Sequence, residues 1–512
     1  MDQMYCIIGL TLVAFSLLYR YLTSTYVYWK DKSIPCLKGA LPGLGHVAPM
    51  IFLRKQMSDL YRDFYNEMPD CSLFGFYNFR SPSLILRDPE LVKCVMSKNF
   101  KDFSDNHFEI DKSMDPILAA NPFFTNGERW KASRQQLTSA FTSGKLKYLL
   151  ESIRVACGEL DSYVNKKCRE KTRPDTAELE LKDLFSKYTA EVVASSAFGV
   201  DGDSFKSDSK DGPFRAVGRL VFEPNFAKGL IQTIVLFLPA LSRVLKTRFM
   251  PKEVDQFFRK IVKDVIRHRE ERGIERPDFL QLMIEAKKNA KVDASLEQVF
   301  DDDIITVNAA SFFLDGYETA SIMLSFLVFQ LATHPEVQDR LRQEVVNVVS
   351  KSGGLTYEAV QEMVYMDRVI SESTRFYPVT GALLKRCTSD TELVGPDGIT
   401  CNVSKGTFIV IPVAALHMDP EYWTKPEEFN PERFTEENKQ RRHKFVHLPF
   451  GEGPRICPGQ RVAMLIMKAA VATIIQKYRF ELSSRTKIPI QLDPNYFLST
   501  AVGGLWVKFT PL

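Results

Sequence analysis

One stretch of 33 residues, 301–333, constrains the fold of this chain more than any other feature. It reads DDDIITVNAASFFLDGYETASIMLSFLVFQLAT and is apolar on nearly every face, which is typical of a helix buried on all sides. The aspartates at its start suit the positive end of a helix dipole, and His334-Pro335 marks its end. The stretch therefore predicts a long central helix inside a mainly helical domain.

Polar residues interrupt this helix at its midpoint. Asp315, Gly316, Glu318 and Thr319 occur where a membrane span would be continuously apolar. A glycine inside a helix costs about 1 kcal/mol relative to alanine, and a buried carboxylate costs more. These residues therefore predict a functional reason for polarity at the centre of a buried helix, rather than a transmembrane segment.

The remainder of the chain is mostly helical by pattern, with short strand-like runs at 83–88 and 406–414 and without internal repeats. A length of 512 residues allows one large domain or two to three ordinary ones. The formal net charge of +4 is too small to indicate a nucleic-acid partner. The pattern predicts an α+β fold, mainly α with small β-sheets.

The N-terminus is predicted to be a membrane anchor. Residues 4–19 are uncharged and would span about 24 Å as a helix, slightly less than the ~30 Å hydrocarbon core. Arg20 can reach the interface, so the span can continue beyond it, and Tyr26, Tyr28 and Trp29 resemble an interfacial aromatic belt. A cleaved signal peptide is the alternative, but no basic region precedes the apolar run and no clear A-x-A site follows it.

The sequence after the anchor predicts a cytosolic domain. Arg20 and the lysines that follow it all lie after the span, so the positive-inside rule keeps the C-terminal portion in the cytosol. Nine scattered cysteines without a CxxC pair agree with a reducing compartment. We expect an anchor over 1–28, a Pro/Gly-rich linker over 29–49 and a globular catalytic domain over 50–512.

A single cysteine, Cys457, lies in the stretch FGEGPRICPG at 450–459, just before an apolar helical pattern. It could be a packed thiol, a nucleophile or a metal ligand; packing is the default for a lone cysteine, and no cysteine-protease signature surrounds this one. Its position at the positive end of a helix, with Arg455 nearby, favours a thiolate. Phe450 can pack against the sulfur and exclude water. A shielded thiolate is what an axial iron ligand requires.

FGEGPRICPG resembles the FxxGxRxCxG cysteine-ligand loop of the haem-thiolate monooxygenases, the cytochrome P450 superfamily, with every fixed position filled. ESTR at 372–375 resembles that family's ExxR helix, PERF at 431–434 its second arginine segment, and WKASR at 130–134 its WxxxR helix. The resemblance covers essentially the whole chain and is strongest for the insect microsomal detoxification clan. It implies the cytochrome P450 fold: a single large helical domain with a smaller β-rich part, and helix 301–333 over the haem.

The resemblance implies haem b, iron protoporphyrin IX, with Cys457 as the axial thiolate and metal ligand. The other cofactor-binding residues that it implies are Trp130, Arg134, Arg386, Arg455, Phe450 and Gly459. The tryptophan and the arginines would donate to the haem propionates, because burying two carboxylates requires several donors.

The ExxR resemblance also implies a charge triad. Glu372 and Arg375 share a helix face, and with Arg433 they would form a buried group that supports the cysteine loop. A lone ExxR would instead be a surface ion pair worth well under ~1 kcal/mol.

The polar midpoint of helix 301–333 reads DGYET, where the family has [AG]Gx[DE]T on the oxygen-binding face of the haem. The resemblance implies that Gly316 leaves space for dioxygen and that Glu318 and Thr319 deliver protons. Asp315 departs from the pattern, which has a small residue at this position. It could alter proton delivery, select polar substrates, or join a neighbouring hydrogen-bond network with no catalytic part.

The activity that the resemblance implies is insertion of one oxygen atom of O2 into a lipophilic small molecule: a xenobiotic, fatty acid, terpenoid or steroid. No dinucleotide-binding motif occurs in the chain, so its electrons would come from NADPH through a separate NADPH-cytochrome P450 reductase, with cytochrome b5 as an optional second donor. The enzyme would lie in the endoplasmic reticulum membrane, with its catalytic domain on the cytosolic side. Two alternatives stay open: a haem-thiolate isomerase or dehydratase that needs no external electrons, and a non-catalytic haem- or lipid-binding protein.

Regions that vary in the family are expected to contact the substrate and partners. The segment 219–249 is either two packed core helices or a mobile lid that touches the membrane. A basic cluster around 439–444 could dock an acidic reductase or be an ordinary solvated face. The aromatic residues that we expect in the substrate pocket are Phe108, Phe222, Phe226, Phe312 and Phe313.

Overall fold

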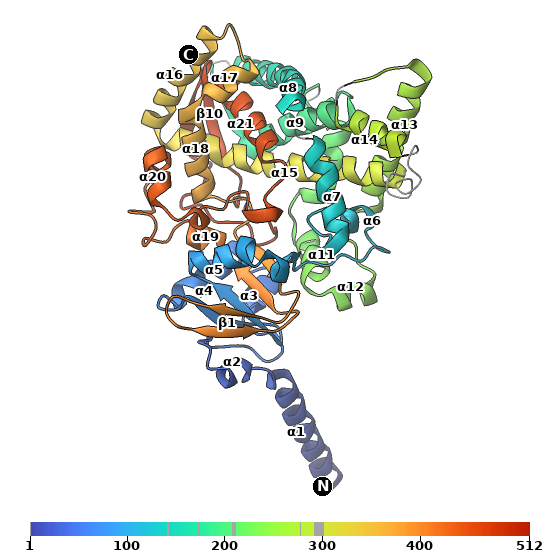
Figure 1. Cartoon of the computed structure of the whole chain (residues 1–512), viewed down its shortest axis with the longest axis vertical. Coiled ribbons are helices and arrows are strands. Elements are labelled where there is room, and N and C mark those ends of the chain that lie inside the picture. Colours follow the sequence, from blue (N-terminus) through green and yellow to red (C-terminus); the bar gives the residue numbers. More distant parts are fainter. Residues whose placement is uncertain (1, 141–142, 171–174, 207–210, 277, 291–301) are drawn as a thin grey trace.

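The computed structural model describes residues 2–140, 143–170, 175–206, 211–276, 278–290 and 302–512. Most of these residues are helical, and the strands form three small sheets, as the sequence predicts. Figure 1 shows a large helical part at the top, a β-rich part below it, and one long helix that projects from the β-rich part and carries the N-terminus. The predicted mainly α fold with small β-sheets is confirmed.

The helix α15, Asp302–Thr333, runs through the middle of the helical part (Figure 1). It ends where the sequence predicts, immediately before His334 and Pro335, and residue 301 lies outside the described residues. Helix α9, Leu181–Val193, packs along α15, and α21, Gln460–Ile475, and α18, Val364–Phe376, pack against other faces of it. The long central helix is therefore enclosed, as its apolar surface requires.

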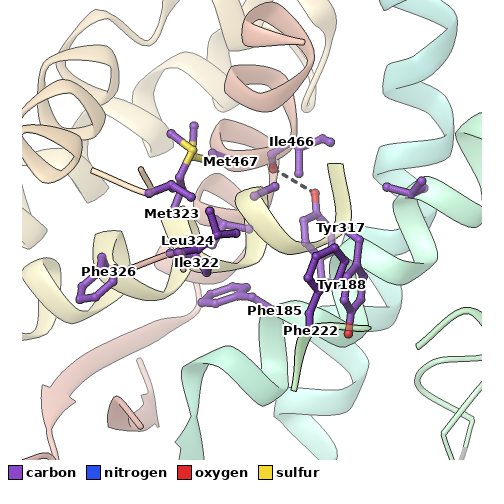
Figure 2. Close-up of a cluster of buried hydrophobic side chains, with 14 of the residues drawn as sticks. Phe185, Tyr188, Phe222, Tyr317, Ile322, Met323, Leu324, Phe326, Ile466 and Met467 are labelled. Carbon is purple, nitrogen blue, oxygen red and sulfur yellow. Dashed lines mark hydrogen bonds between the residues drawn. The ribbon is translucent and has the colours of Figure 1, made fainter. Parts of the chain in front are cut away.

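The core around α15 is aromatic and aliphatic (Figure 2). Phe185, Tyr188, Tyr317, Leu324 and Met467 each expose at most 1% of their surface. Of the two tyrosine hydroxyls among them, that of Tyr188 donates to the Ile466 carbonyl at 3.0 Å. Burial on this scale is the main source of fold stability, at roughly 25 cal/mol per Å² of apolar surface.

The other helices of eight or more residues surround this core. They are α4 Met57–Glu67, α7 Gly127–Ala140, α8 Ser143–Arg169, α10 Pro213–Phe222, α11 Phe226–Phe237, α13 Lys252–Arg272, α14 Phe279–Ala290 and α16 Pro335–Lys351. Shorter ones are α2 Tyr28–Asp31, α3 Ala48–Ile51, α5 Pro89–Lys93, α6 Pro116–Ala120, α12 Pro239–Leu245, α17 Tyr357–Glu362, α19 Val413–Leu416 and α20 Glu436–Arg441.

The largest sheet has the strand order β1-β2-β8-β5-β3, and β2 and β8 are its parallel neighbours. Its strands are β1 Leu73–Asn78, β2 Ser81–Leu86, β3 Asp105–Asn106, β5 Leu383–Arg386 and β8 Phe408–Ile411. The predicted runs at 83–88 and 406–414 correspond to β2 and β8, and the second is shorter than expected because Pro412 ends the strand before α19. This sheet forms the β-rich part beside the N-terminal helix (Figure 1).

Two smaller antiparallel sheets complete the fold. One contains β4 Ala177–Glu180, β10 Trp506–Pro511 and β9 Tyr478–Leu482, and the other pairs β6 Thr391–Val394 with β7 Thr400–Val403. Because β10 lies between β4 and β9, the C-terminal strand joins segments that are about 300 residues apart in the chain.

The N-terminal helix α1, Asp2–Thr23, exposes its apolar side chains except Leu22, which lies against Gly43. Among the described residues, two helices are long and apolar enough to cross a membrane: Gln3–Thr23, with none of its apolar window buried, and Asp303–Thr333, with 78% of it buried. Of these, α1 alone has apolar surface without protein contacts, so it is the one that fits a membrane anchor.

Residues 29–49, expected as a linker, pack onto the largest sheet. The Trp29 side chain is 1% exposed and lies against Gly75 of β1, where an added Cβ would be 2.4 Å from the indole ring. Cys36 pairs with Gly75 and Gly45 with Asn78 through isolated β-bridges. The backbone of this segment is therefore held by the sheet, and the boundary at residue 28 stays a prediction.

The segment 219–249 is helical and partly packed into the core, and its part as a mobile lid stays a prediction. It contains the end of α10, the whole of α11 and α12, and a bend of 70° between α10 and α11. Val235 and Leu236 are buried, whereas Phe226 is 64% exposed and Val244 78% exposed. One face of the segment is thus core and the other presents apolar side chains to the surroundings.

Candidate active site

The loop before α21 folds tightly around Cys457. The Cys457 N–H donates to the Phe450 carbonyl at 2.9 Å, which closes the loop between the two ends of the motif. Gly453 has φ of 72°, and a Cβ there would lie 2.1 Å from the Met96 carbonyl oxygen, so this position requires glycine. The loop delivers the sulfur to the first turn of α21, next to Gly459 and Gln460.

The environment of the Cys457 thiol differs from the prediction in one respect. Burial raises its pKa to about 11, although the backbone N–H groups of Gly459 and Gln460 and the charge of Arg134 act in the opposite direction. The helix terminus therefore favours the thiolate, but it does not outweigh burial. A bound metal cation deprotonates a coordinating thiol outright. The Cys457 sulfur is therefore suited to bind a metal ion in its thiolate form.

Arg455, Trp130 and Arg134 gather beside this loop. The Arg455 guanidinium lies 4.4 Å from the centroid of the Trp130 ring, and its Nη2 donates to the Thr125 carbonyl at 3.0 Å. Arg134 Nη1 donates to the Ile456 carbonyl at 2.6 Å, one residue before the cysteine. The structure thus brings together the WxxxR helix and the cysteine loop.

A further cation, Lys385, belongs to this group and was not selected from the sequence. Its side chain is 5% exposed, and its Nζ donates to Asn106 Oδ1 at 3.0 Å. Burial, and next the positive charge of Arg455, lower the pKa of Lys385 to about 7. The acid that offsets these charges is Asp105, whose Oδ1 is 3.9 Å from Arg455 Nη2.

Arg134, Lys385 and Arg455 therefore place three cations close to the cysteine loop, and Asp105 is the carboxylate that the structure shows beside Arg455. Burial lowers the pKa of Arg455 to about 10, which shows the cost of its positive charge there. Buried cations are stabilised by anionic partners with good hydrogen-bond geometry. The set fits a ligand with two carboxylates, such as haem.

Arg386 does not join this group. Its Nη2 donates to the His107 carbonyl at 2.8 Å, and its Nη1 lies 3.7 Å from Glu109 Oε2. Successive side chains of a strand point to opposite faces, so in β5 the neighbours Lys385 and Arg386 diverge. Once the direction of one of these side chains is known, the alternation along the strand gives the direction of the other.

The centre of α15 carries an accessible strip. Asp315 is exposed, and Gly316 and Thr319 are partly exposed, although the residues around them are buried. The Thr319 hydroxyl donates to the Asp315 carbonyl at 2.5 Å. A Cβ at Gly316 would lie 3.4 Å from a methyl of Val193 in α9, which is an ordinary contact distance, so the packing of α9 alone does not require glycine here.

The Asp315 carboxylate lies deep in the molecule and faces this accessible strip. Both of its oxygens are 3.1 Å from the Asn121 amide nitrogen. Burial raises the pKa of Asp315 to about 7, and the Asn121 amide acts against that rise. Its charge also contributes to the raised pKa of the Cys457 thiol, which places the carboxylate near the sulfur.

Glu318 belongs to a different face of α15. Its side chain is 1% exposed, and its Oε2 forms an ion pair with Lys182 Nζ of α9 at 2.7 Å. Its Oε1 accepts no hydrogen bond from the residues that the structure describes. Glu318 and Lys182 both line a cavity of about 340 Å³ between α9, α10, α15 and the segment 499–505. No feature of the sequence pointed to Lys182.

The predicted triad is present. Arg375 forms a pair with Glu372 at 2.7 Å, with both side chains fully buried, and Arg433 Nε lies 3.3 Å from Glu372 Oε1. Arg375 also donates to the His417 carbonyl at 2.9 Å, and His417 Nε2 accepts the Leu448 N–H at 2.8 Å. The triad therefore connects to the residue two positions before the cysteine loop.

Comparisons with known proteins agree with this geometry. The family model described as cytochrome P450 matches residues 37–506. The chain is 34% identical to cytochrome P450 9e2 of Blattella germanica, over 97% of this chain and 96% of the relative. It is 34% identical to probable cytochrome P450 6a13 of Drosophila melanogaster, over 97% of both chains, and 32% identical to cytochrome P450 6B6 of Helicoverpa armigera, over 96% of both.

Members of this family bind haem through a cysteine thiolate, and NADPH supplies their electrons through a reductase. The model match over nearly the whole length, together with these relatives, shows that the chain belongs to the cytochrome P450 family and is consistent with a monooxygenase.

Proposed function

We propose that this chain is a membrane-anchored monooxygenase of the endoplasmic reticulum that oxidises a lipophilic small molecule on the cytosolic side. The observation that carries the proposal is the placement of the Cys457 thiol at the start of α21, near the accessible strip of α15 formed by Asp315, Gly316 and Thr319. A family match and a metal-ligating sulfur in this setting support oxygen chemistry between the two helices.

Cys457 would bind the haem iron. The haem carboxylates would accept hydrogen bonds or ion pairs from Arg134, Lys385, Arg455 and Trp130. When bound, haem supplies the activation of dioxygen. Phe450 accepts the Cys457 N–H through its carbonyl, and a Cβ at Gly459 would lie at an ordinary contact distance, 3.9 Å, from the Cys457 Sγ. Arg386 is not needed for this arrangement, given its bond to His107.

Proton delivery is the proposed task of Glu318 and Thr319. The buried Glu318 carboxylate borders a cavity that opens toward the surface, and Lys182 holds one of its oxygens. Thr319 is one residue farther along α15 and faces the accessible strip. A carboxylate that borders a cavity open to the surface is suited to exchanging protons with solvent.

The substrate would pack against aromatic residues near Asn121. Phe108 has ring neighbours Phe123, Phe124 and Phe237, at centroid distances of 5.6–6.2 Å. The other phenylalanines expected in the pocket are elsewhere: Phe313 is fully buried among core rings, Phe312 packs on Phe279, Phe222 stacks on Tyr317, and Phe226 is on the surface. Phe222 also lines the cavity of about 340 Å³ beside Glu318, so Phe108 and Phe222 are the two of the five that we retain as candidates for a pocket wall.

The basic cluster proposed for docking is partly neutralised within the chain. Lys439 pairs with Glu436, Arg441 with Glu437 and Lys444 with Glu452, and Arg442 stacks on the Trp423 ring. Such pairs reduce the positive potential that would steer an acidic partner. The reductase and cytochrome b5 remain proposed partners, and this cluster is a weak candidate for their docking surface.

The proposal is tested with the purified chain in detergent. We expect the carbon monoxide difference spectrum of the reduced protein to show the thiolate-ligated haem band, and Cys457→Ser to abolish it. Cys401→Ala, which removes a buried thiol of β7, is the matched control and should leave the band unchanged. An unaltered band in Cys457→Ser would contradict the proposed ligand.

Reconstitution with the reductase separates the alternatives. A monooxygenase forms oxygenated product only with NADPH and reductase present. Turnover of a lipid hydroperoxide without reductase would instead favour an isomerase or dehydratase. Absence of product and of NADPH consumption across a panel of lipophilic compounds would favour a haem- or lipid-binding protein.

A further inference from the structure

Asp315 combines three features that make it an unusual acid among the residues that the structure describes. It stands where the family pattern has alanine or glycine, it lies deep inside the molecule, and its side chain is nevertheless accessible at the strip that faces the cysteine loop. A ligand bound at this strip could therefore contact the Asp315 carboxylate directly.

The group that does contact Asp315 is neutral. Asn121 is 1% exposed, and its Oδ1 accepts the Phe123 N–H at 2.7 Å, which fixes the amide so that its nitrogen points at the carboxylate. Among the side chains that the structure describes, no lysine, arginine or histidine forms an ion pair with Asp315, and burial and the Asn121 amide are what act on its carboxylate. The Asn121 amide therefore gives the Asp315 carboxylate a hydrogen bond but no positive charge.

The same loop carries apolar, aromatic groups. Phe123 and Phe124 follow Asn121 after Pro122, and their rings pack on each other at 5.0 Å and on Phe108. A carboxylate combined with aromatic rings on a neighbouring loop suits organic cations, through ion pairing and through the negative faces of the rings. A neutral ligand would leave the buried charge without a partner.

We propose that Asp315 selects substrates that carry a cationic nitrogen, with the positive group beside its carboxylate and the apolar remainder against Phe108 and Phe124. The inference rests on the proposed monooxygenase function and names its substrate class as lipophilic amines and quaternary ammonium compounds. Asn121 acts as a positioning residue that holds the carboxylate.

The test uses two ligands of the same shape. Benzyltrimethylammonium and neopentylbenzene differ by a nitrogen in place of a carbon, and the quaternary nitrogen has no lone pair with which to ligate iron. We expect wild-type protein to bind the cation at least on the order of tenfold more tightly than the neutral isostere. Asp315→Asn, which keeps a group that can accept from Asn121, should reduce this preference to about one, with the affinity for the neutral ligand unchanged.

Two further variants make the test decisive. Asp303→Asn removes an acid that is 71% exposed on the same helix and should retain the full preference. Asp315→Ala restores a residue of the family pattern, so it serves if Asp315→Asn does not fold. Equal binding of the two ligands by the wild type, or an unchanged preference in both Asp315 variants, would overturn the proposal.

Affinity is read in two ways, so that failure of the proposed function and failure of this inference are distinguishable. Ligand-induced changes in the haem spectrum report binding to the holoenzyme, and the rise in thermal midpoint with ligand concentration reports binding without reference to haem. If the carbon monoxide band is present and the cation preference is missing, the inference alone is wrong. If the band is missing, the proposed function fails while the thermal measurement still tests Asp315.

Discussion

Lys182 of α9 is paired with Glu318 of α15, Nζ to Oε2, at 2.7 Å, and the carboxylate of this pair is 1% exposed. Removal of one member of a buried pair leaves the other charge uncompensated, which typically costs more than the pair contributes. The pair also lines the cavity through which solvent can reach α15. It therefore connects the packing of α9 with the proposed proton delivery.

Lys182→Met is expected to slow oxygenation on the order of tenfold and to lower the product formed per NADPH consumed, because Glu318 loses its counter-charge. Product and peroxide are measured together under reductase turnover. Lys182→Arg keeps the charge and should restore most of the coupling. Full coupling in Lys182→Met would show that this pair has no part in proton delivery.

Lys385→Met is expected to release haem on the order of tenfold faster than wild type, since it removes a cation from the group that would hold the carboxylates. Transfer of haem to an excess of a scavenging globin gives the rate. Lys385→Arg should release haem slowly, and Arg386→Met, on the opposite face of β5, should match wild type. The reverse order, with Arg386 dominant, would contradict the placement described above.

Acid is expected to destabilise the protein through buried histidines. Burial, and next the charge of Arg375, lower the pKa of His417 from 6.5 to about 3, and burial lowers that of His107 to about 3. The unfolded chain therefore binds more protons than the folded chain between about pH 6.5 and 3. Stability is complete above this window and falls within it, by about 1.4 kcal/mol per pH unit for each such proton.

His417 is the informative site for this effect. Its Nε2 accepts the Leu448 N–H, and protonation would turn that acceptor into a donor. Denaturant unfolding at pH 7 and pH 5 should show a smaller pH dependence for His417→Gln than for wild type. An identical slope would assign the acid sensitivity to other groups.

The triad is expected to be essential for folding. Glu372→Gln leaves the guanidinium of Arg375 without its carboxylate at a fully buried position, at a cost of about 3–5 kcal/mol. Thermal unfolding and the yield of haem-containing protein measure the loss. Glu437→Gln, in the exposed pair with Arg441, is the control and should change neither quantity. A triad variant as stable as this control would show that the buried charges are dispensable.

Deletion of residues 2–23 is expected to leave a chain that still binds lipid vesicles. Phe226 and Val244, with their exposed apolar neighbours on α11 and α12, provide a second apolar surface. Cosedimentation of the truncated chain measures binding, and Leu230→Asp with Val244→Asp should abolish it. A truncated chain that stays in solution would assign membrane binding to α1 alone.

Features set by neighbouring residues could be predicted from the sequence, whereas contacts between residues far apart in the chain could not. The apolar run and the proline at 335 were enough to locate α15, and the three-residue spacing of Glu372 and Arg375 was enough to pair them. By contrast, Asn121 meets Asp315 across 194 positions, and Lys182 meets Glu318 across 136. Such pairs depend on how the helices pack, which no local spacing encodes.

The expected linker shows the same limit. Proline and glycine at 31–49 indicate turns, but they do not reveal that Trp29 fits against Gly75, because that contact needs a missing side chain on a strand 46 positions away. The sequence pointed to Arg386 as a haem-binding residue and not to Lys385, which the structure places beside Arg455, for a related reason. The packing of the sheet decides which face of β5 points inward. Because Lys385 and Arg386 are both positively charged, their residue types do not show which of them lies on that face.

The contact of Trp29 with Gly75 has a mechanical consequence. It joins α1 to the five-stranded sheet by a short, packed connection rather than a tether, and the Arg80 guanidinium lies 3.8 Å from the centroid of the Tyr21 ring near the same junction. In a bilayer, α1 would then act as a stiff stem: tilting it turns the whole globule, so lipid thickness sets the angle at which the protein faces the interface.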